Sequence, residues 1–355
     1  MVLQTNVKLN LGLEVLRKRP DGYHDIETLF VPCHEFGDTL EVITGDDYSH
    51  TSASLFARYG SLDFPEEQSG PGRVHSRFAP LAAAEYGLRP AAPPELVQGI
   101  SEDGKLMITI AREEGVDWEP LKDLCAKAYF LLANDFQLPP VKIFLEKKAP
   151  VGAGLGGGSA DAAFTLKALN ELCCLGLDNE KLAEYASKLG SDCAFFIWNR
   201  PMIGTGRGEI LEPFDLDLSG YEIKVLVPEG ISVSTAEAYR GIVPRDMIDG
   251  GTTAPTTVSL RSTPLLASLR SAPVPPLSVP RVAAVAGAVV PPSNLREVLR
   301  RPVEEWKGVL VNDFEATVFK AHPELEAIKQ SLYESGAAYA AMSGSGSAMF
   351  GIYKK

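Results

Sequence analysis

The sequence has 355 residues, of which 45% are hydrophobic and 23% charged, so it is long enough for two domains with separate cores. Its formal net charge of −12 repels a polyphosphate backbone, so we expect no nucleic-acid partner. No stretch has the apolar length of a membrane span and the first residues do not form a signal peptide, so we expect no membrane association and a cytoplasmic location.

The cysteines indicate neither a disulfide framework nor a zinc site. There are five of them, two are adjacent, and no C-x-x-C spacing occurs. We therefore expect free thiols.

Strands dominate the expected start of the chain, because apolar and polar residues alternate there. The predicted strands lie at 5–16, 25–32, 38–44, 105–111 and 140–147. A Pro-Asp-Gly turn joins the first two into a hairpin. Helical spacing predicts helices at 120–135, 159–174 and 178–189, the first beginning at Pro120 and the last capped by Asp178.

The second half mixes both kinds of element. Strands are predicted at 194–198, 202–204 and 222–228, and helices at 234–241, 302–320 and 323–335. The chain ends with a strand, a glycine-rich turn and a strand over 337–353. Strands and helices that do not alternate strictly indicate an α+β protein.

Two stretches have a biased composition rich in Ala, Pro and Ser. They cover about 46–103 and 246–294, and we expect solvated insertions there, with a short helix possible at 78–88.

A glycine-rich run from Pro150 to Ala163 lies between a predicted strand and a predicted helix. Glycine amides and a helix N-terminus together favour a bound phosphate group. A Walker A loop is excluded because the run has no lysine. Residues 152–157 match G-x-G-x-x-G, but a dinucleotide fold requires a second parallel strand after the helix, where a further helix is predicted here.

The run resembles the second signature of the GHMP kinases. Two further segments resemble their first and third signatures, in the same order: Lys8–Leu13 and Met342–Ser347. The resemblance implies a ribosomal protein S5 domain 2-like N-terminal domain over 1–200 and a ferredoxin-like C-terminal domain over 201–355, interrupted by the two insertions. It also implies that ATP, with Mg²⁺, phosphorylates a small-molecule hydroxyl group.

Within that superfamily the chain resembles the branch that phosphorylates the 2-hydroxyl of a methylerythritol carrying a cytidine diphosphate, in non-mevalonate isoprenoid synthesis. The resemblance rests on the segments 19–24, 27–28, 190–196, 204–209 and 312–315. The Asp-Gly-Tyr-His element at 21–24 is the most telling, because a cytosine ring needs a stacking face and hydrogen-bond partners. A monomer or weak homodimer is expected.

The resemblance also implies roles for individual residues. Lys8 and Asp161 are the expected catalytic pair, with Asp161 accepting the hydroxyl proton. The ATP phosphates are expected at Pro150, Gly152, Ala153, Gly154, Leu155, Gly156, Gly157, Gly158 and Ser159. The substrate is expected at Asn10, Tyr23, His24, Asp161, Ile203 and Thr205, where Ile203 takes the place of a second stacking ring.

Two positions are assigned less narrowly. Asp192 is expected to be a helix cap or a substrate contact, and Asp123 stands where these kinases typically have Asn, on the adenine side. No side-chain cage for a metal is predicted.

Three alternatives remain open. The first is another GHMP kinase, one that acts on homoserine, mevalonate or a sugar. The second is a nucleotide-binding homologue without catalysis, and the third is a nicotinamide-dependent oxidoreductase. Retention of Lys8 and Asp161 argues against the second.

Overall fold

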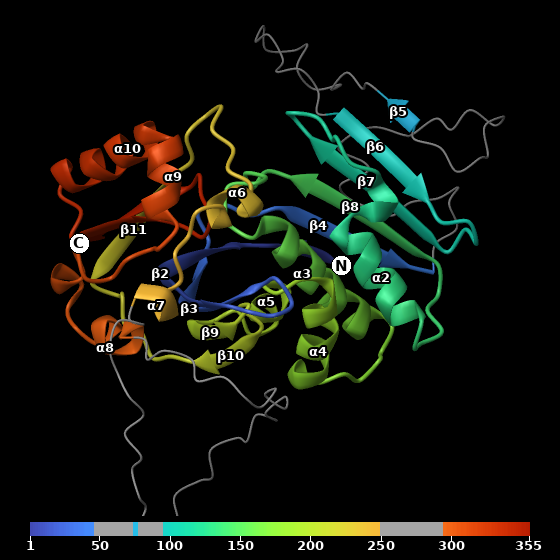
Figure 1. Ribbon diagram of the computed structural model, residues 1–355. Coiled ribbons are helices and arrows are strands. Elements are labelled where there is room, and N and C mark those ends of the chain that lie inside the picture. Colours follow the sequence, from blue (N-terminus) through green and yellow to red (C-terminus); the bar gives the residue numbers. More distant parts are fainter. Residues whose placement is uncertain (46–73, 77–94, 249–293) are drawn as a thin grey trace, which may run out of the picture.

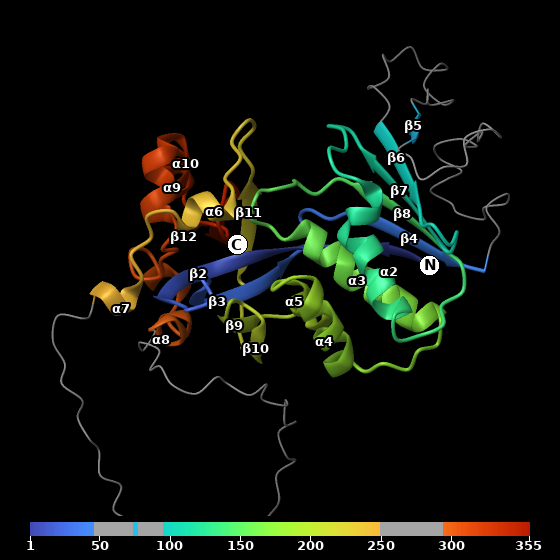
Figure 2. The same cartoon turned by 45° about the vertical axis from the view of Figure 1, so that its right-hand side comes forward.

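The computed structural model describes residues 1–45, 74–76, 95–248 and 294–355. Within these ranges the chain forms a six-stranded, a four-stranded and a three-stranded sheet. The six-stranded sheet and the three-stranded sheet lie at opposite ends of the molecule, and the long hairpin of the four-stranded sheet runs between them (Figures 1 and 2). No helix in the described ranges is long and apolar enough to cross a membrane.

The six-stranded sheet has one helical face. Its strand order is β1 (Val2–Gln4), β4 (Thr39–Thr44), β8 (Val141–Lys147), β7 (Leu106–Arg112), β6 (Glu95–Ile100) and β5 (Val74–Ser76). Only β7 and β8 pair in parallel among these strands. The helices beside it are α2 (Leu124–Ala133), α3 (Gly157–Leu172), α4 (Asn179–Leu189) and α5 (Cys193–Trp198). Their apolar side chains and those of the sheet form one buried core.

The four-stranded sheet is built on the predicted hairpin. Its order is β10 (Ile210–Pro213), β9 (Met202–Gly206), β3 (His24–Cys33) and β2 (Val7–Lys18), and every neighbouring pair is antiparallel. Tyr23 is exposed at the end of the β2–β3 turn, immediately before β3. Since β9 and β10 complete this sheet, the segment just after residue 200 packs with the N-terminal hairpin, and the domain boundary at 200 stays a prediction.

The three-stranded sheet has the order β11 (Tyr221–Leu226), β13 (Met349–Lys354) and β12 (Tyr339–Met342). The longer helices near it are α9 (Glu315–Ala321) and α10 (Pro323–Glu334), with the short α6 (Thr235–Tyr239) beside α9. The shorter elements are η1 (Pro120–Lys122), α7 (Arg245–Ile248), α8 (Leu295–Leu299) and η2 (Val303–Glu305). This mixture of sheets and helices confirms the α+β class.

Three element predictions need correction. Residues 194–198 form the helix α5 rather than a strand, because a short apolar run has no period that separates a buried helix from a buried strand. The single helix predicted at 302–320 is two shorter helices, η2 and α9, separated by irregular chain. The expected first insertion ends early: β6 is a strand of the six-stranded sheet and buries Leu96 and Val97.

Other expectations agree with the structure, differ from it at one end of an element, or fall outside the described residues. Asp178 caps α4 by accepting a hydrogen bond from the Lys181 amide at 2.8 Å, as predicted. Pro120 begins the short η1, whereas α2 begins only after Asp123. The possible helix at 78–88 lies outside the described residues.

Candidate active site

A cavity of about 1310 Å³ brings together segments that are far apart in the sequence. Its wall includes Lys8 and Asn10 of β2, the hairpin residues Tyr23 and His24, and the whole predicted phosphate loop, residues 150–159. The wall also includes residues 232–236 and Tyr239, around α6, the C-terminal turn residues Gly344 and Ser345, and the side chains of Lys147 and Asp161. The structure therefore gathers most of the predicted site residues around one space.

The phosphate loop ends in a helix N-terminus that suits an anion. Gly156 precedes α3 with a φ of 73°, and no side chain caps the helix there. No acidic residue lies in the first turn of α3 either. The amides of that turn and the positive end of the helix dipole therefore face the cavity with no acidic side chain from the turn itself.

The loop also touches the C-terminal turn closely. Gly154 has a φ of 76°, and a Cβ atom there would lie 2.4 Å from the carbonyl oxygen of Ser343. Only glycine allows this approach. The contact holds the phosphate loop against the turn that resembles the third signature.

Lys8 lies in the middle of the cavity wall, and its side chain is 5% exposed. Its Nζ donates hydrogen bonds to Asn10 Oδ1 and, at 3.3 Å, to the carbonyl of Gly154. The carboxylate that pairs with it is Asp192, with Nζ 3.4 Å from Oδ2. The Asp192 side chain is 30% exposed and lines the cavity, so this pair is accessible to a substrate.

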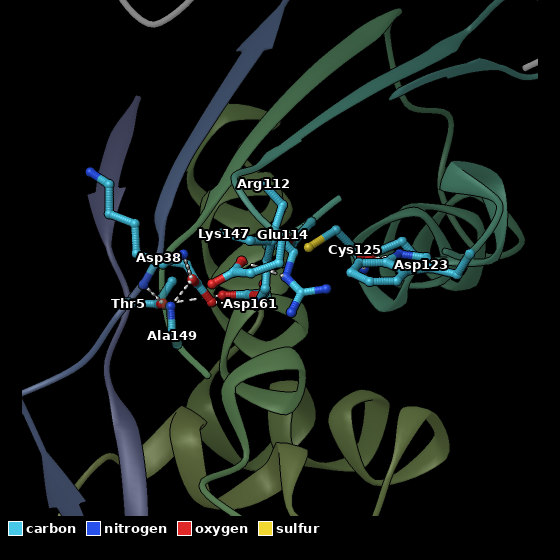
Figure 3. Close-up of polar contacts among 12 residues, drawn as sticks. Thr5, Asp38, Arg112, Glu114, Asp123, Cys125, Lys147, Ala149 and Asp161 are labelled. Carbon is cyan, nitrogen blue, oxygen red and sulfur yellow. Dashed lines mark hydrogen bonds and ion pairs between the residues drawn. The ribbon is translucent and has the colours of Figure 1, made fainter. Parts of the chain in front are cut away.

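Asp161 lies in a different environment. Both of its carboxylate oxygens are engaged: Oδ1 accepts from Thr5 Oγ1 at 3.1 Å and Oδ2 from Lys147 Nζ at 2.7 Å (Figure 3). Lys147 Nζ also donates to Asp38. Asp161 is 1% exposed, so the structure places it in a buried ion-pair cluster under α3 and does not show it paired with Lys8.

The same cluster holds the start of the phosphate loop. Asp38 Oδ1 accepts hydrogen bonds from the backbone amides of Lys148 and Ala149 at 2.6 and 2.7 Å. Burial raises the pKa of Asp161 to about 8, because the neighbouring Asp38 charge adds to a desolvation that Lys147 only partly offsets. For Lys147 the two carboxylates outweigh burial, so its pKa is raised.

An aromatic stack lies at the hairpin end of the cavity. The His24 and Tyr239 rings are stacked, with centroids 4.6 Å apart and planes 13° apart. Phe314 packs edge-on against Tyr239 at 4.7 Å. Burial, with a smaller effect of Lys18, lowers the pKa of His24, so its imidazole is neutral near pH 7. Nearby, the Arg207 guanidinium lies 5.0 Å above the exposed Tyr23 ring.

Two predicted substrate residues do not reach the cavity. Ile203, expected in place of a second stacking ring, is fully buried in the core beside β2 and β3 and does not line the cavity. Thr205 is also absent from the cavity wall, and its hydroxyl donates to the Ile210 carbonyl at 3.4 Å. The ring that stacks is Tyr239, which the sequence signalled only as an aromatic residue in a predicted helix.

Asp123 has a structural role on the far side of the phosphate loop. One oxygen caps α2 by accepting from the Cys125 amide at 2.8 Å, and the other accepts from Trp118 Nε1 at 2.9 Å. Trp118, Lys122 and Asp123 line the cavity beside Pro150, so this end can receive a flat ring. Within the described ranges, no group of three or more His, Cys, Asp or Glu side chains is arranged to hold a metal ion.

Comparisons with known proteins agree with this arrangement. Residues 123–200 match the GHMP kinases N terminal domain and residues 295–355 match the GHMP kinases C terminal domain. A 4-diphosphocytidyl-2-C-methyl-D-erythritol kinase of Bacteroides fragilis is 38% identical over 353 residues, 99% of this chain and 92% of that protein. The enzyme of the same name from Parabacteroides distasonis is 35% identical over 355 residues, 100% of this chain and 92% of that protein.

A solved structure extends the comparison. The crystal structure of a 4-(cytidine 5′-diphospho)-2C-methyl-D-erythritol kinase superposes with a TM-score of 0.58 and 26% identity, covering 99% of this chain and 89% of that one. The sequence matches run over almost the whole length of both proteins. The chain therefore belongs to the GHMP kinases and, within them, to the 4-diphosphocytidyl-2-C-methyl-D-erythritol kinase family.

Proposed function

We propose that the protein transfers the γ-phosphoryl group of ATP to the 2-hydroxyl of 4-diphosphocytidyl-2-C-methyl-D-erythritol, releasing ADP and the 2-phosphate. The observation that carries the proposal is the order of groups along one cavity: a phosphate loop, an accessible Lys8–Asp192 pair, and an aromatic stack. The loop suits the nucleotide phosphates, the stack suits a cytosine ring, and the pair suits the hydroxyl between them.

The pair supplies the proton chemistry. Asp192 accepts the proton of the substrate hydroxyl. At the same time the hydroxyl oxygen attacks the γ-phosphorus of ATP, and the bond between the γ-phosphorus and the β-phosphate oxygen of the departing ADP breaks. Lys8, held by Asn10 and by the Gly154 carbonyl, stabilises the charge that develops on the transferred group. Asp161, the expected base, has both oxygens engaged in the buried cluster, and we assign it the positioning of α3 instead.

The nucleotide fits the residues present. The uncapped N-terminus of α3 and the backbone amides of residues 151–159 receive its phosphates, while Trp118 offers a face for the base. Mg²⁺ keeps several waters and binds mainly through phosphate oxygens, so few protein ligands are needed, and Ser159 would hold it with the phosphates. The ion neutralises charge on the phosphate oxygens when bound.

At the other end, the cytosine base stacks against Tyr239 and contacts His24, whose neutral ring both donates and accepts hydrogen bonds. Burial and the Asp192 charge raise the pKa of Tyr239 to about 12, so its hydroxyl stays protonated. We expect the reaction to run in the cytoplasm, with each chain acting as a monomer or in a weak homodimer.

The test measures ADP release with ATP, Mg²⁺ and 4-diphosphocytidyl-2-C-methyl-D-erythritol, beside homoserine, mevalonate and galactose. We expect turnover of the cytidylyl substrate alone. Asp192→Asn and Lys8→Met should each lower kcat about 100-fold or more, as expected when a proton acceptor or charge stabiliser is lost.

Asp161→Asn is the matched control, since it removes a carboxylate from the buried cluster. Its kcat should exceed that of Asp192→Asn by about tenfold or more, measured below the unfolding temperature of both variants. The reverse order would return the catalytic role to Asp161. Turnover of another alcohol, and not the cytidylyl substrate, would refute the proposed acceptor.

A further inference from the structure

The aromatic stack depends on a short segment that approaches from the C-terminal half. Tyr239 ends α6, and Arg245 begins α7 six positions later. Tyr239 packs against Phe314 and stacks on His24, and the carbonyl of its neighbour Ala238 accepts a hydrogen bond from Thr317 Oγ1 at 3.0 Å.

Arg245 joins two parts of the protein. Its Nη1 lies 2.7 Å from Glu14 Oε1, on the β2 strand of the hairpin. Its Nε and Nη2 donate to the two oxygens of Asp313, at 3.1 and 2.9 Å. This forked geometry fixes the relative position of the two carboxylates, which a point charge would not do.

Asp313 connects Arg245 to the residue that packs against the aromatic stack. Its Oδ2 also accepts from the Val15 amide at 2.8 Å, so it is tied to β2 from a second direction. The next residue, Phe314, is 3% exposed and packs against Tyr239. Phe314 and Tyr239 both line the cavity, and Tyr239 stacks on His24.

The hairpin carries a second arginine–glutamate ion pair, and this one has no contact with Asp313. Glu14 and Glu27 lie directly opposite each other on β2 and β3, and both are buried. Each faces an arginine: Arg245 for Glu14, and Arg296 of α8 for Glu27, with Arg296 Nε 2.9 Å from Glu27 Oε1. Arg296 also reaches Glu212 of β10 at 2.8 Å, on the side away from the stack. The two arginines thus neutralise the same pair of glutamates, and only Arg245 also binds Asp313.

We propose that Arg245 is a positioning residue for the cytidylyl substrate, because its fork to Glu14 and Asp313 sets the Phe314–Tyr239 side of the aromatic stack against the hairpin that carries His24. The inference rests on the proposed function and adds a residue outside the cavity wall to its specificity. It concerns the base-binding end alone, so the nucleotide phosphates at the other end are unaffected.

The test is steady-state kinetics of Arg245→Met, with the two substrates varied separately. The KM for 4-diphosphocytidyl-2-C-methyl-D-erythritol should rise about tenfold, while the KM for ATP stays within about twofold of the wild type. Arg245→Lys keeps the charge and loses the fork, so its KM should lie between those of the wild type and the Met variant. If the Met variant does not fold, the Lys variant carries the test.

Arg296→Met is the matched control, because it removes the ion pair of Glu27 on the same hairpin and leaves the contacts of Asp313 unchanged. Its KM for the cytidylyl substrate should rise clearly less than that of Arg245→Met. Equal rises in the two variants, a parallel rise in the KM for ATP, or an unchanged KM would overturn the inference. A wild-type protein that does not turn over the cytidylyl substrate would refute the proposed function, and this inference with it.

Discussion

Two carboxylates that line the cavity, Asp192 and Asp161, differ in what surrounds them. Asp192 pairs with Lys8 and is 30% exposed, whereas Asp161, although it also lines the cavity, is 1% exposed and shares Lys147 with Asp38. A second negative charge in such a site is opposed by desolvation and by the first charge. Burial and the neighbouring Asp38 charge therefore raise the pKa of Asp161, so it retains a proton at a pH where an exposed carboxyl group is ionised.

That proton makes stability depend on pH in a predictable direction. The pKa of Asp161 is raised in the folded state, from 3.8 to about 8, so the folded protein binds more protons than the unfolded chain between these values. The contribution of protonated Asp161 to the free energy of unfolding is fully present below the pKa of the unfolded state, 3.8, and is lost as the pH rises through about 8. Wild-type stability should therefore fall, relative to Asp161→Asn, between about pH 5 and about pH 8.

Urea unfolding of both proteins at intervals across this range measures the effect. We expect the difference in free energy of unfolding, wild type minus variant, to become steadily less favourable as the pH increases. Two curves that run parallel over the whole range would mean that Asp161 is ionised throughout, and that the cluster carries a net negative charge.

At the scale of elements, the phosphate loop is held by its contact with the C-terminal turn. Gly154 combines a left-handed φ with a carbonyl oxygen 2.4 Å from where a Cβ atom would lie. Gly176, after α3, has a similar φ of 68° and nothing within 4 Å of that position. A side chain at Gly176 would therefore meet backbone strain alone, whereas a side chain at Gly154 would meet both backbone strain and a steric clash.

Alanine at each position tests the contact. Gly176→Ala should cost about 1 kcal/mol of unfolding free energy, the usual strain of a left-handed residue, and leave the KM for ATP unchanged. Gly154→Ala should cost about 2–4 kcal/mol and raise the KM for ATP about tenfold, because the loop must move away from the turn. Chemical denaturation and initial rates measure the two quantities, and equal effects of the two substitutions would show that the contact is unimportant.

At the scale of the whole molecule, the substrate end of the cavity is assembled from both halves of the chain. His24 comes from the N-terminal hairpin, Tyr239 from α6, and Phe314 from the segment before α9. A ligand that inserts its base here must contact both sides. Binding energy at this end therefore depends on how the halves are held together.

Replacing the Tyr239 ring tests the stack directly. Tyr239→Leu should raise the KM for the cytidylyl substrate about tenfold through the loss of base stacking, and Tyr239→Phe should stay within about threefold of the wild type because the ring is retained. The KM for ATP serves as the internal reference in both variants. If Phe and Leu behaved alike, the hydroxyl rather than the ring face would be the feature that the substrate uses.

Much of this architecture follows from local sequence. Alternating residues determined β2, β3, β4, β7 and β8, and the Pro-Asp-Gly turn determined the hairpin. The glycine-rich run determined a phosphate loop before a helix, because its chemistry depends on neighbouring backbone groups. The helix α5 was missed for the opposite reason, since burial from all sides removes the periodicity on which such predictions depend.

The pairing of side chains was decided only by the tertiary structure. The family resemblance implied Asp161 as the partner of Lys8, but α3 packs on β4 and Asp161 is buried with Lys147, while Asp192 is the carboxylate that pairs with Lys8. Likewise, Ile203 is turned into the core by the pleat of β9, and the ring at the cavity comes from Tyr239. Local sequence determined the loop, the hairpin and the class of fold because their interactions are between neighbours. Which carboxylate is accessible, and which ring faces His24, depends on contacts between segments more than a hundred residues apart, and no local pattern encodes these contacts.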